Sequence, residues 1–231
     1  VRATLSLLAQ HRPASTIIFC NTKAQCRAVC AALDDAGVHS LAFHGDLDQR
    51  ERTLVMVRFA NRSCTVLVAT DVAARGLDIE GLDAVINYDV PFKAQTYVHR
   101  AGRTGRAGAT GLAFSLVTPG QGARVQAIGE ALQADFQTRP APLGAGGRHP
   151  ELAPPMVTLS INGGRKAKLS AGDVLGALTA KGGVAGDAVG KIDRMDQVTF
   201  VAVKRAEART ALRALRAAPI KRRRFRVTLH G

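Results

Sequence analysis

The sequence predicts an α/β protein, in which a doubly wound parallel sheet is followed by a small, basic α+β domain. Strand-like and helix-like segments alternate through the first 135 residues, which is typical of a parallel sheet with crossover helices. Val66–Ala69 is apolar throughout, without the alternation of a half-buried strand, so both of its faces should be covered. Most of the net positive charge lies after residue 138, which indicates a second module with a different role.

Five short apolar segments are the predicted strands of the sheet, and four longer segments are the predicted helices. The strands are Thr16–Cys20, Ser40–Phe43, Thr65–Ala69, Ala84–Tyr88 and Gly111–Val117, and the helices are Lys23–Ala36, Gln49–Ala60, Ala94–Ala101 and Gly120–Ala134. Ligands of such sheets bind at the carboxyl ends of the strands, so functional residues are expected there.

The pattern changes after residue 136. Residues 137–155 hold five prolines and three glycines with little apolar periodicity, which predicts a linker between a domain of residues 1–136 and a domain of residues 156–231. The second domain reads as β-α-β-β-α-β, the order of an RNA-recognition-motif-like (RRM-like) fold. Its strands are expected at Met156–Ile161, Ala188–Ile192, Val198–Val203 and Phe225–Leu229, and its helices at Ala171–Thr179 and Arg205–Arg216.

Charge separates the two halves. Residues 1–138 carry 14 Lys and Arg against 12 Asp and Glu, whereas residues 139–231 carry 18 against 6, and together these give the net charge of +14. A basic module joined to a nearly neutral one suggests a polyanionic partner for the second half, most simply nucleic acid. A merely solubilising surface is the alternative.

Other classes of protein fit poorly. A hydrophobic content of 46% is that of a globular chain, and no apolar run approaches the roughly 20 residues of a membrane span, so no membrane partner is expected. The start lacks Met and resembles the middle of a protein, which suggests a fragment. Cys20, Cys26, Cys30 and Cys64 complete no zinc-binding pattern, so we expect no metal and read them as buried thiols of a reducing cytoplasm.

The most informative stretch is His99–Gly108, in which a histidine and three arginines are interleaved with glycines after a predicted helix. Glycines allow tight turns, so that the guanidinium groups can converge on one anion. Phosphoryl transfer requires such groups, because charge on the γ-phosphate must be stabilised in the transition state. Taken alone, the run could equally be a flexible basic loop.

Three further stretches accompany this run. They are Ile18–Thr22 at the end of one strand, His44–Asp46 with Gln49 and Arg52 at the start of a helix, and Ala69–Asp78 after the buried strand. Together with His99–Gly108 they resemble motifs IV, IVa, V and VI of the DEAD-box RNA helicases in order and spacing. The resemblance covers residues 1–135 and implies a RecA-like fold.

The resemblance implies roles for individual residues. Arg103 and Arg106 resemble the arginine fingers on the nucleotide phosphates, Asp78 would contact the ribose, and Gly76 would allow close approach of the backbone. His99 and Arg100 resemble inter-domain coupling residues that reach toward the partner helicase domain and motif V. The residues expected along the RNA backbone, or supporting that surface, are Thr22, Gln49, Arg52, Thr70 and Arg75.

Simpler structural roles remain open for some motif residues. Thr70 and Asp71 could cap the turn that follows them. His44 and Asp46 could fix a loop rather than contact a ligand.

Half of an ATP site is absent from the sequence. It contains no Gly-x-x-x-x-Gly-Lys-Thr loop and no Asp-Glu-Ala-Asp segment, which in this family lie in an amino-terminal RecA-like domain. The cofactor would be ATP with Mg²⁺, and the magnesium would be held by that missing domain. The chain alone should therefore hydrolyse no meaningful amount of ATP.

The tail resembles the carboxy-terminal RNA-binding domain of the DbpA subfamily, bacterial DEAD-box proteins directed to 23S ribosomal RNA. The matching segments are Met156–Lys168, Asp173–Thr179, Gly190–Ile192 and Phe200–Val203. Strand alternation would place Thr158, Ser160 and Phe200 on the outer face, with one aromatic ring at most for base stacking. With Phe225, Val227 and Leu229 inward, the same alternation would place Arg222, Arg224 and Arg226 outward on the last strand. Recognition by charge and shape is expected instead, through Arg165, Lys166, Lys168, Lys191, Arg194, Arg222, Arg224 and Arg226. A solvated basic surface is the alternative.

The resulting hypothesis is the carboxy-terminal part of a cytoplasmic, ATP-dependent RNA helicase that unwinds short duplexes during large-subunit ribosome assembly. Its partners would be 23S ribosomal RNA in the pre-ribosomal large subunit and its own amino-terminal RecA-like domain. A DEAD-box helicase of another RNA pathway and an ATP-independent RNA chaperone are the competing interpretations.

Overall fold

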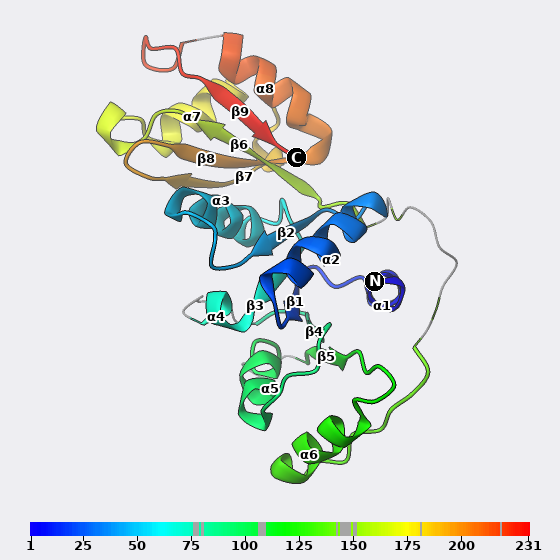
Figure 1. Cartoon of the computed structure of the whole chain (residues 1–231). Coiled ribbons are helices and arrows are strands. Elements are labelled where there is room, and N and C mark those ends of the chain that lie inside the picture. The colour runs from blue at the N-terminus through cyan, green and yellow to red at the C-terminus, as the bar shows by residue number, and fades with distance from the viewer. Residues whose placement is uncertain are drawn as a thin grey trace. The chain divides into compact units, whose positions relative to one another are not determined.

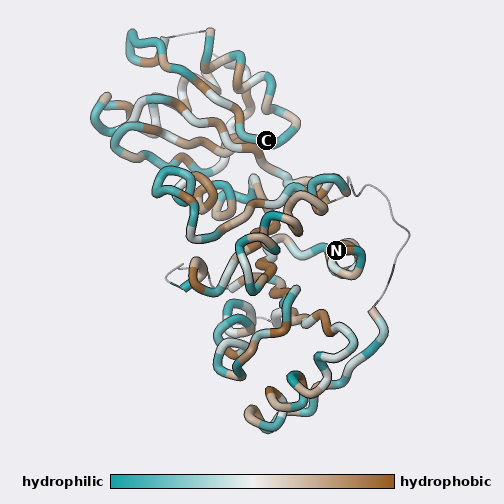
Figure 2. The backbone as a smooth tube through the Cα atoms, in the orientation of Figure 1, coloured by the Kyte–Doolittle hydropathy of each residue, from teal (hydrophilic) through white to brown (hydrophobic). Residues whose placement is uncertain are grey.

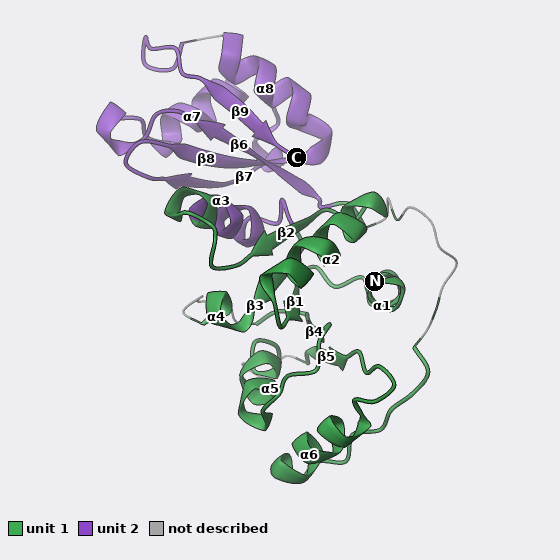
Figure 3. Ribbon diagram, in the orientation of Figure 1, with its two compact units in different colours: residues 1–52, 65–153 green, residues 53–64, 154–231 purple. Residues whose placement is uncertain are grey.

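The structure is a computed structural model that describes residues 1–75, 79, 81–105, 110–141, 143, 149, 152–180, 182–217 and 219–231. The chain divides into two compact units, Val1–Arg52 with Thr65–Ala153 and Thr53–Cys64 with Pro154–Gly231 (Figure 3). Helix α3 (Gln49–Ala60) begins in the first unit and ends in the second. The domain boundaries expected from the sequence, 1–136, 137–155 and 156–231, stay a prediction.

The first unit contains a five-stranded parallel sheet in the order β2-β3-β1-β4-β5 (Figure 1). Its strands are β1 (Thr16–Cys20), β2 (Ser40–Phe43), β3 (Val66–Thr70), β4 (Ala84–Asn87) and β5 (Leu112–Ser115). Every residue of β1, β3 and β4 is buried, which explains why their sequences are apolar without alternation. The predicted RecA-like doubly wound sheet is confirmed.

Helices flank this sheet, and two of them were not expected from the sequence. The helices of the first unit besides the start of α3 are α1 (Arg2–His11), α2 (Lys23–Asp35), α4 (Asp71–Ala74), α5 (Ala94–Ala101) and α6 (Gly122–Leu132). α1 buries Leu7 and Leu8, and α4 is a single turn too short to give a periodic pattern. Ile18, Val68 and Ile86 of the central strands pack with α1 and α2 in one apolar core, and the hydrophobic colour of Figure 2 gathers along these strands.

Two helix starts are fixed by side-chain caps. Thr22 precedes α2, and its hydroxyl accepts a hydrogen bond from the Gln25 amide at 3.1 Å. At α3 the Asp48 amide donates to Glu51 Oε2 and the Glu51 amide donates to Asp48 Oδ1, both at 2.8 Å. This reciprocal pair satisfies two amides that the helix itself leaves unpaired.

Described residues near the end of the predicted linker attach to the first unit. The His149 amide donates to the Ala36 carbonyl at 2.9 Å, and Leu152 packs against the apolar core formed by α1, α2 and the central strands. The chain is therefore anchored shortly before it enters the second unit at Pro154.

The tail forms a four-stranded antiparallel sheet in the order β7-β8-β6-β9, with two α-helices. Its elements are β6 (Met156–Ile161), η2 (Arg165–Ala167), α7 (Ala171–Thr179), η3 (Gly186–Ala188), β7 (Val189–Arg194), β8 (Thr199–Lys204), η4 (Arg205–Glu207), α8 (Ala208–Ala217) and β9 (Val227–His230). The predicted β-α-β-β-α-β order is confirmed. None of the helices in the described part of the chain is long and apolar enough to cross a membrane.

Alternation on the tail strands sorts side chains between two faces as predicted. Val157, Leu159 and Ile161 of β6 lie in a core that also contains Leu178 of α7 and Leu215 of α8. The neighbouring side chains of the same strands lie on the other face of the sheet.

This other face is covered rather than open, which the sequence did not indicate. Thr158 is 0% exposed and Phe200 is 6% exposed. Within the second unit the Asn61 amide group donates to the Thr158 hydroxyl at 2.9 Å, and the Ser63 and Thr158 hydroxyls lie 2.6 Å apart. Phe200, which pairs with Ser160 of β6, is likewise buried.

Candidate functional site

Arg100, the first arginine of the Arg/Gly run, is the centre of the site in the first unit. Its side chain is 1% exposed although it is charged. Nε and Nη2 donate to the two carboxylate oxygens of Asp71, each at 2.7 Å. Nη2 also donates to Asn21 Oδ1 at 3.0 Å. A buried charge requires such partners, and the bidentate geometry suits a guanidinium group.

The remaining donors of Arg100 bind the last residue of β4 and the segment that follows it. Nη1 donates to Asn87 Oδ1 at 3.1 Å and to the Asp89 carbonyl at 2.7 Å. The Asp89 carboxylate accepts the Asn21 amide at 2.8 Å. All five N–H groups of Arg100 therefore have acceptors.

Arg100 joins the carboxyl ends of β1, β3 and β4, where Asn21, Asp71 and Asp89 follow their strands. The sequence correctly associated Arg100 with motif V, because Asp71 belongs to that motif. Since Arg100 is buried, any coupling to another domain would pass through residues such as Asp71. Asn87 and Asp89 were missed, although a polar residue at the end of an apolar strand was a usable signal.

The arginine-finger candidates lie just beyond α5. Arg103 is partly exposed, and its carbonyl accepts the Leu82 amide at 3.0 Å. The Thr104 hydroxyl donates to the Leu82 carbonyl, so the start of the Arg/Gly loop is pinned. His99 is exposed, as a residue that contacts another domain must be. Gly76, Asp78 and Arg106 lie outside the described residues.

The predicted RNA-backbone residues follow three adjacent strands. Thr22 follows β1, Gln49 and Arg52 follow β2, and Thr70 and Arg75 end or follow β3. Because β2, β3 and β1 are neighbours and parallel, these residues lie along one edge of the sheet.

The five candidates on this edge differ in accessibility. Thr22, Gln49 and Arg75 are exposed, Arg52 is partly exposed, and Thr70 is buried. The first three can contact a ligand directly, whereas Thr70 can only support the surface.

Arg52 is used mainly to hold the loop after β2. Its Nε donates to the Leu47 carbonyl at 3.2 Å, and its guanidinium lies 5.4 Å from the centre of the Phe43 ring. Asp46 in the same loop pairs with Lys23 and with Arg27 at 3.4 Å. The Lys23 ammonium lowers the pKa of Asp46, and burial lowers the pKa of His44. Asp46 thus fits the loop-fixing role, whereas Nδ1 of the buried His44 ring has no hydrogen-bond partner among the described residues.

The capping alternative for Thr70 and Asp71 finds no support. Thr70 precedes α4 without a side-chain capping bond, and the Asp71 carboxylate is taken by Arg100. The four cysteines are buried, and none of them forms a disulfide with another. A hydrogen bond with Cys26, together with burial, raises the pKa of Cys20. The described residues contain no group of three His, Cys, Asp or Glu side chains placed to hold a metal.

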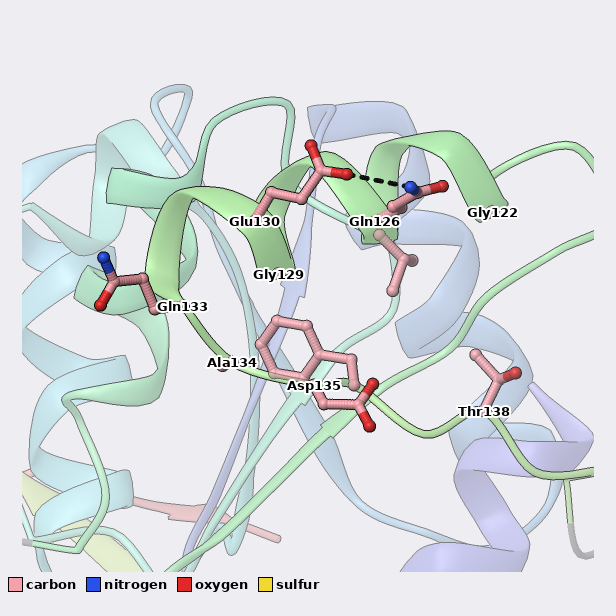
Figure 4. A pocket seen from close by; sticks show the side chains of 10 residues that line it. Gly122, Gln126, Gly129, Glu130, Gln133, Ala134, Asp135 and Thr138 are labelled. Atoms are coloured by element: carbon pink, nitrogen blue, oxygen red, sulfur yellow. Dashed lines mark hydrogen bonds between the residues drawn. The ribbon is translucent and has the colours of Figure 1, made fainter.

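A pocket of about 560 Å³ lies along α6 and the residues that follow it (Figure 4). Gln126 and Glu130, which are hydrogen-bonded at 2.9 Å, line it together with Phe136. No motif residue lines it, so it belongs to neither candidate site.

Cationic side chains of the tail are concentrated where three connecting segments meet. We call the basic end the surface formed by residues 162–168, 194–196 and 221–226. These segments carry three, one and five cationic side chains, against a single carboxylate, Asp196. Of the predicted RNA contacts, Arg165, Lys166, Lys168, Arg194, Arg222, Arg224 and Arg226 all lie here and are exposed.

Backbone hydrogen bonds connect the three segments. The Arg165 amide donates to the Met195 carbonyl at 2.9 Å, and the Asn162 amide donates to the Arg226 carbonyl at 2.9 Å. Gly164 is required at the first of these junctions, because a Cβ there would lie 2.1 Å from the Met195 carbonyl oxygen. The predicted basic loop and the basic segment before β9 therefore form one surface.

One detail of the predicted tail contacts needs correction, and Lys191 stays a prediction. Arg222 and Arg224 were expected to alternate outward along the last strand, but β9 begins only at Val227, because a tight turn pairs Ile220 with Arg223. Arg223 is exposed as well and was missed. Lys191 lies on β7, outside the basic end, and pairs with Asp193 at 3.0 Å.

Two family models match the chain. One is described as helicase conserved C-terminal domain and matches residues 1–108, and the other is described as DbpA RNA binding domain and matches residues 158–229. The ATP-dependent RNA helicase DbpA of Escherichia coli is 47% identical over 96% of this chain and 48% of its own length. The protein of the same name from Bacillus subtilis is 34% identical over 96% and 50%. The chain thus spans about half the length of these relatives.

Solved structures agree with the fold of the first unit. The Escherichia coli DEAD-box protein SrmB, bound to regulator of ribonuclease activity A, has a TM-score of 0.57 at 33% identity, over 66% of this chain and 86% of that one. Saccharomyces cerevisiae Dbp5, bound to RNA and ADP BeF3, has a TM-score of 0.54 at 34% identity, over 60% and 37%. The chain therefore belongs to the DEAD-box RNA helicases and, with its tail domain, to the DbpA subfamily.

Proposed function

We propose that this chain is the carboxy-terminal half of an ATP-dependent RNA helicase, directed to structured RNA by the basic end of its tail. The observation that supports the proposal is that three motifs meet at Arg100. Arg100 belongs to His99–Gly108, and its side chain binds Asn21 of Ile18–Thr22 and Asp71 of Ala69–Asp78. By binding Asn21, Asp71 and Asp89, Arg100 fixes the strand ends from which nucleotide-facing and RNA-facing residues project.

The residues present fit one side of a nucleotide site. Arg103 is partly exposed, in a loop whose start is held by hydrogen bonds to the Leu82 backbone. In the proposal Arg103 and Arg106 contact the ATP phosphates, Asp78 contacts the ribose, and Gly76 allows the backbone to approach. ATP would supply the phosphoryl group, and Mg²⁺ would be held by the amino-terminal RecA-like domain. The arginines would stabilise negative charge on that group.

The sheet edge formed after β1, β2 and β3 would contact the RNA backbone. The exposed Thr22, Gln49 and Arg75 would contact phosphate and ribose, while Arg52 and Thr70 would support them. Contacts of this kind do not read sequence, which suits an enzyme that must act on many short duplexes.

The basic end would supply the selectivity that this edge lacks. With Phe200 covered, stacking on the sheet is not its basis, so charge and shape remain. Because the relatives carry the name DbpA and the tail matches that RNA-binding domain, we propose 23S ribosomal RNA of the assembling large subunit, in the cytoplasm, as the target.

Two variants with equal loss of charge test the RNA-binding surface. Arg222→Gln/Arg224→Gln removes two cations from the basic end, whereas Arg209→Gln/Arg213→Gln removes two exposed cations from α8. We expect only the first pair to weaken binding of the whole chain to a structured 23S fragment. Each lost phosphate contact should lower the slope of log affinity against log salt by about 0.7–0.9. Equal weakening by both pairs would favour the solvated-surface alternative.

Competing functions are separable by experiment. Full-length protein that remodels RNA without ATP turnover would support a chaperone. Full-length protein crosslinked in cells to RNA other than 23S ribosomal RNA would support a helicase of another pathway.

A further inference from the structure

The turn that presents the arginines of the basic end has an unusual backbone. The Arg223 amide donates to the Ile220 carbonyl at 3.0 Å and the Ile220 amide donates to the Arg223 carbonyl at 2.9 Å, so Lys221 and Arg222 form a two-residue hairpin turn. Their φ angles are 51° and 65°. Turns with positive φ at both positions normally use Asn-Gly or Gly-Gly, because a Cβ disfavours this region.

Such a conformation persists only where its surroundings hold it. Ile220 is 4% exposed and anchors the start of the turn in the tail core. On the other side, the Lys221 ammonium donates to the Lys168 carbonyl at 3.1 Å and lies 2.9 Å from the Asp173 carboxylate. Lys221 is thus tied to two other segments of the tail.

Both segments that Lys221 contacts are themselves well defined. Lys168 ends the η2 loop in a left-handed conformation with φ of 57°. Asp173 belongs to the capping box of α7, in which the Ser170 hydroxyl accepts the Asp173 amide at 3.1 Å and Asp173 Oδ2 accepts the Ser170 amide at 2.7 Å. Lys221 therefore joins the arginine turn, the η2 loop and the start of α7.

We propose that Lys221 is a positioning residue that clamps the arginine turn against the η2 loop and α7, so that the basic end is ordered before RNA arrives. The idea rests on the proposed RNA-binding function of this surface. The charge of Lys221 is already matched by Asp173, whereas Arg222, Arg223 and Arg224 are exposed and placed to contact phosphates. Ordering the turn in advance reduces the conformational entropy lost on binding.

The clamp and a direct phosphate contact predict opposite effects at Asp173. If Lys221 contacted RNA, Asp173→Asn would remove a repulsive charge and strengthen binding. If Lys221 is a clamp, Asp173→Asn releases the turn and weakens binding. Ser170→Ala is the matched control, because it disturbs the same helix cap while leaving the Lys221 and Asp173 charges in place.

The experiment measures affinity of the whole chain for a structured 23S fragment across a salt series. We expect Lys221→Met to lower affinity by about tenfold, or 1.4 kcal/mol, without lowering the salt slope, and Lys221→Arg to restore most of the loss. A slope reduced by about 0.7–0.9 in Lys221→Met, together with stronger binding by Asp173→Asn, would show direct contact and overturn the clamp. Unchanged affinity in both variants would overturn it too.

Amide hydrogen exchange separates failure of the clamp from failure of the proposed function. Without RNA, Lys221→Met should accelerate exchange of the Arg223 amide, which donates to Ile220 in the turn. Normal protection in that variant contradicts the clamp whatever the RNA results. If the unaltered chain binds no structured RNA while exchange accelerates as expected, the RNA-binding proposal fails and the clamp stands.

Discussion

Replacing Arg100 tests whether this residue organises the helicase half as the structure indicates. Arg100→Ala removes five donors from a buried site and leaves the Asp71 carboxylate, which is 24% exposed, without its partner. Breaking a buried pair costs about 3–5 kcal/mol. Because Asp71 retains some contact with water, the lower part of that range is expected. This is a large fraction of the roughly 5–15 kcal/mol that holds a domain folded.

Arg100→Lys distinguishes charge from geometry. A lysine keeps the positive charge but has three donors instead of five, so at least two acceptors lose their partners. At about 1–3 kcal/mol for each buried group left unpaired, two such groups should cost about 2–6 kcal/mol. Retention of full stability by the lysine variant would mean that charge alone matters.

Tyrosine fluorescence in a urea titration reports the unfolding of the first unit, which contains Arg100. Both tyrosines, Tyr88 and Tyr97, lie in the first unit and the chain has no tryptophan, so tail unfolding does not contribute. The exposed Arg75 of the same motif region serves as control, and Arg75→Ala should change stability by less than about 0.5 kcal/mol. A destabilisation below about 1 kcal/mol for Arg100→Ala would refute the reasoning.

Three other predictions follow from the structure. The chain alone should release no phosphate from ATP above background even with saturating RNA. Turnover typical of an intact helicase would contradict the interpretation that the chain holds only half of an ATP site. Gly164→Ala should lower the tail melting temperature and weaken RNA binding, because the new Cβ would lie 2.1 Å from the Met195 carbonyl oxygen. Hydrogen bonds from Ser170 and Lys221 lower the pKa of Asp173 from 3.8 to about 2. The ionised Asp173 carboxylate therefore stabilises the tail fully above pH 3.8, and this stabilisation is lost as the pH falls through about 2. In Asp173→Asn the free energy of tail unfolding should accordingly fall less steeply over this acidic range.

Local pattern was sufficient for most of the fold. The apolar runs at Ile17–Cys20 and Val66–Ala69 mark buried strands, because a strand covered on both faces is apolar along most of its length. The alternation of Met156–Ile161 marks a strand with one face on the core for the complementary reason. Boundaries agreed to within one or two residues for these strands. The single turn of α4 carries no such periodic signal.

Long-range contacts account for what the sequence did not predict. Arg100 was identified by its motif, but its partners Asn87 and Asp89 come together with it only through the sheet order. Phe200 has the alternation of an outer-face residue and is nevertheless buried. Arg222 was expected to continue the alternation of the last strand. The turn itself gave no local signal, because Lys-Arg is not a usual pair for a turn with positive φ. In that turn the tertiary contacts of Lys221 override local preference.

The central claim is that nucleotide chemistry and RNA selection reside in separate surfaces of this chain. The direct test uses the full-length protein, in which the proposal expects an amino-terminal RecA-like domain, and compares Arg103→Ala with Arg222→Gln/Arg224→Gln.

ATP turnover is measured with a structured 23S fragment and with unstructured RNA, alongside affinity for both. Arg103→Ala should reduce turnover on either RNA by about 10³-fold or more while affinity for the structured fragment stays unchanged. The double variant should lose affinity for the structured fragment and its extra stimulation, yet keep turnover with saturating unstructured RNA. If Arg103→Ala abolished RNA affinity, or the double variant abolished turnover on every RNA, the two functions would not be separable and the account would be wrong.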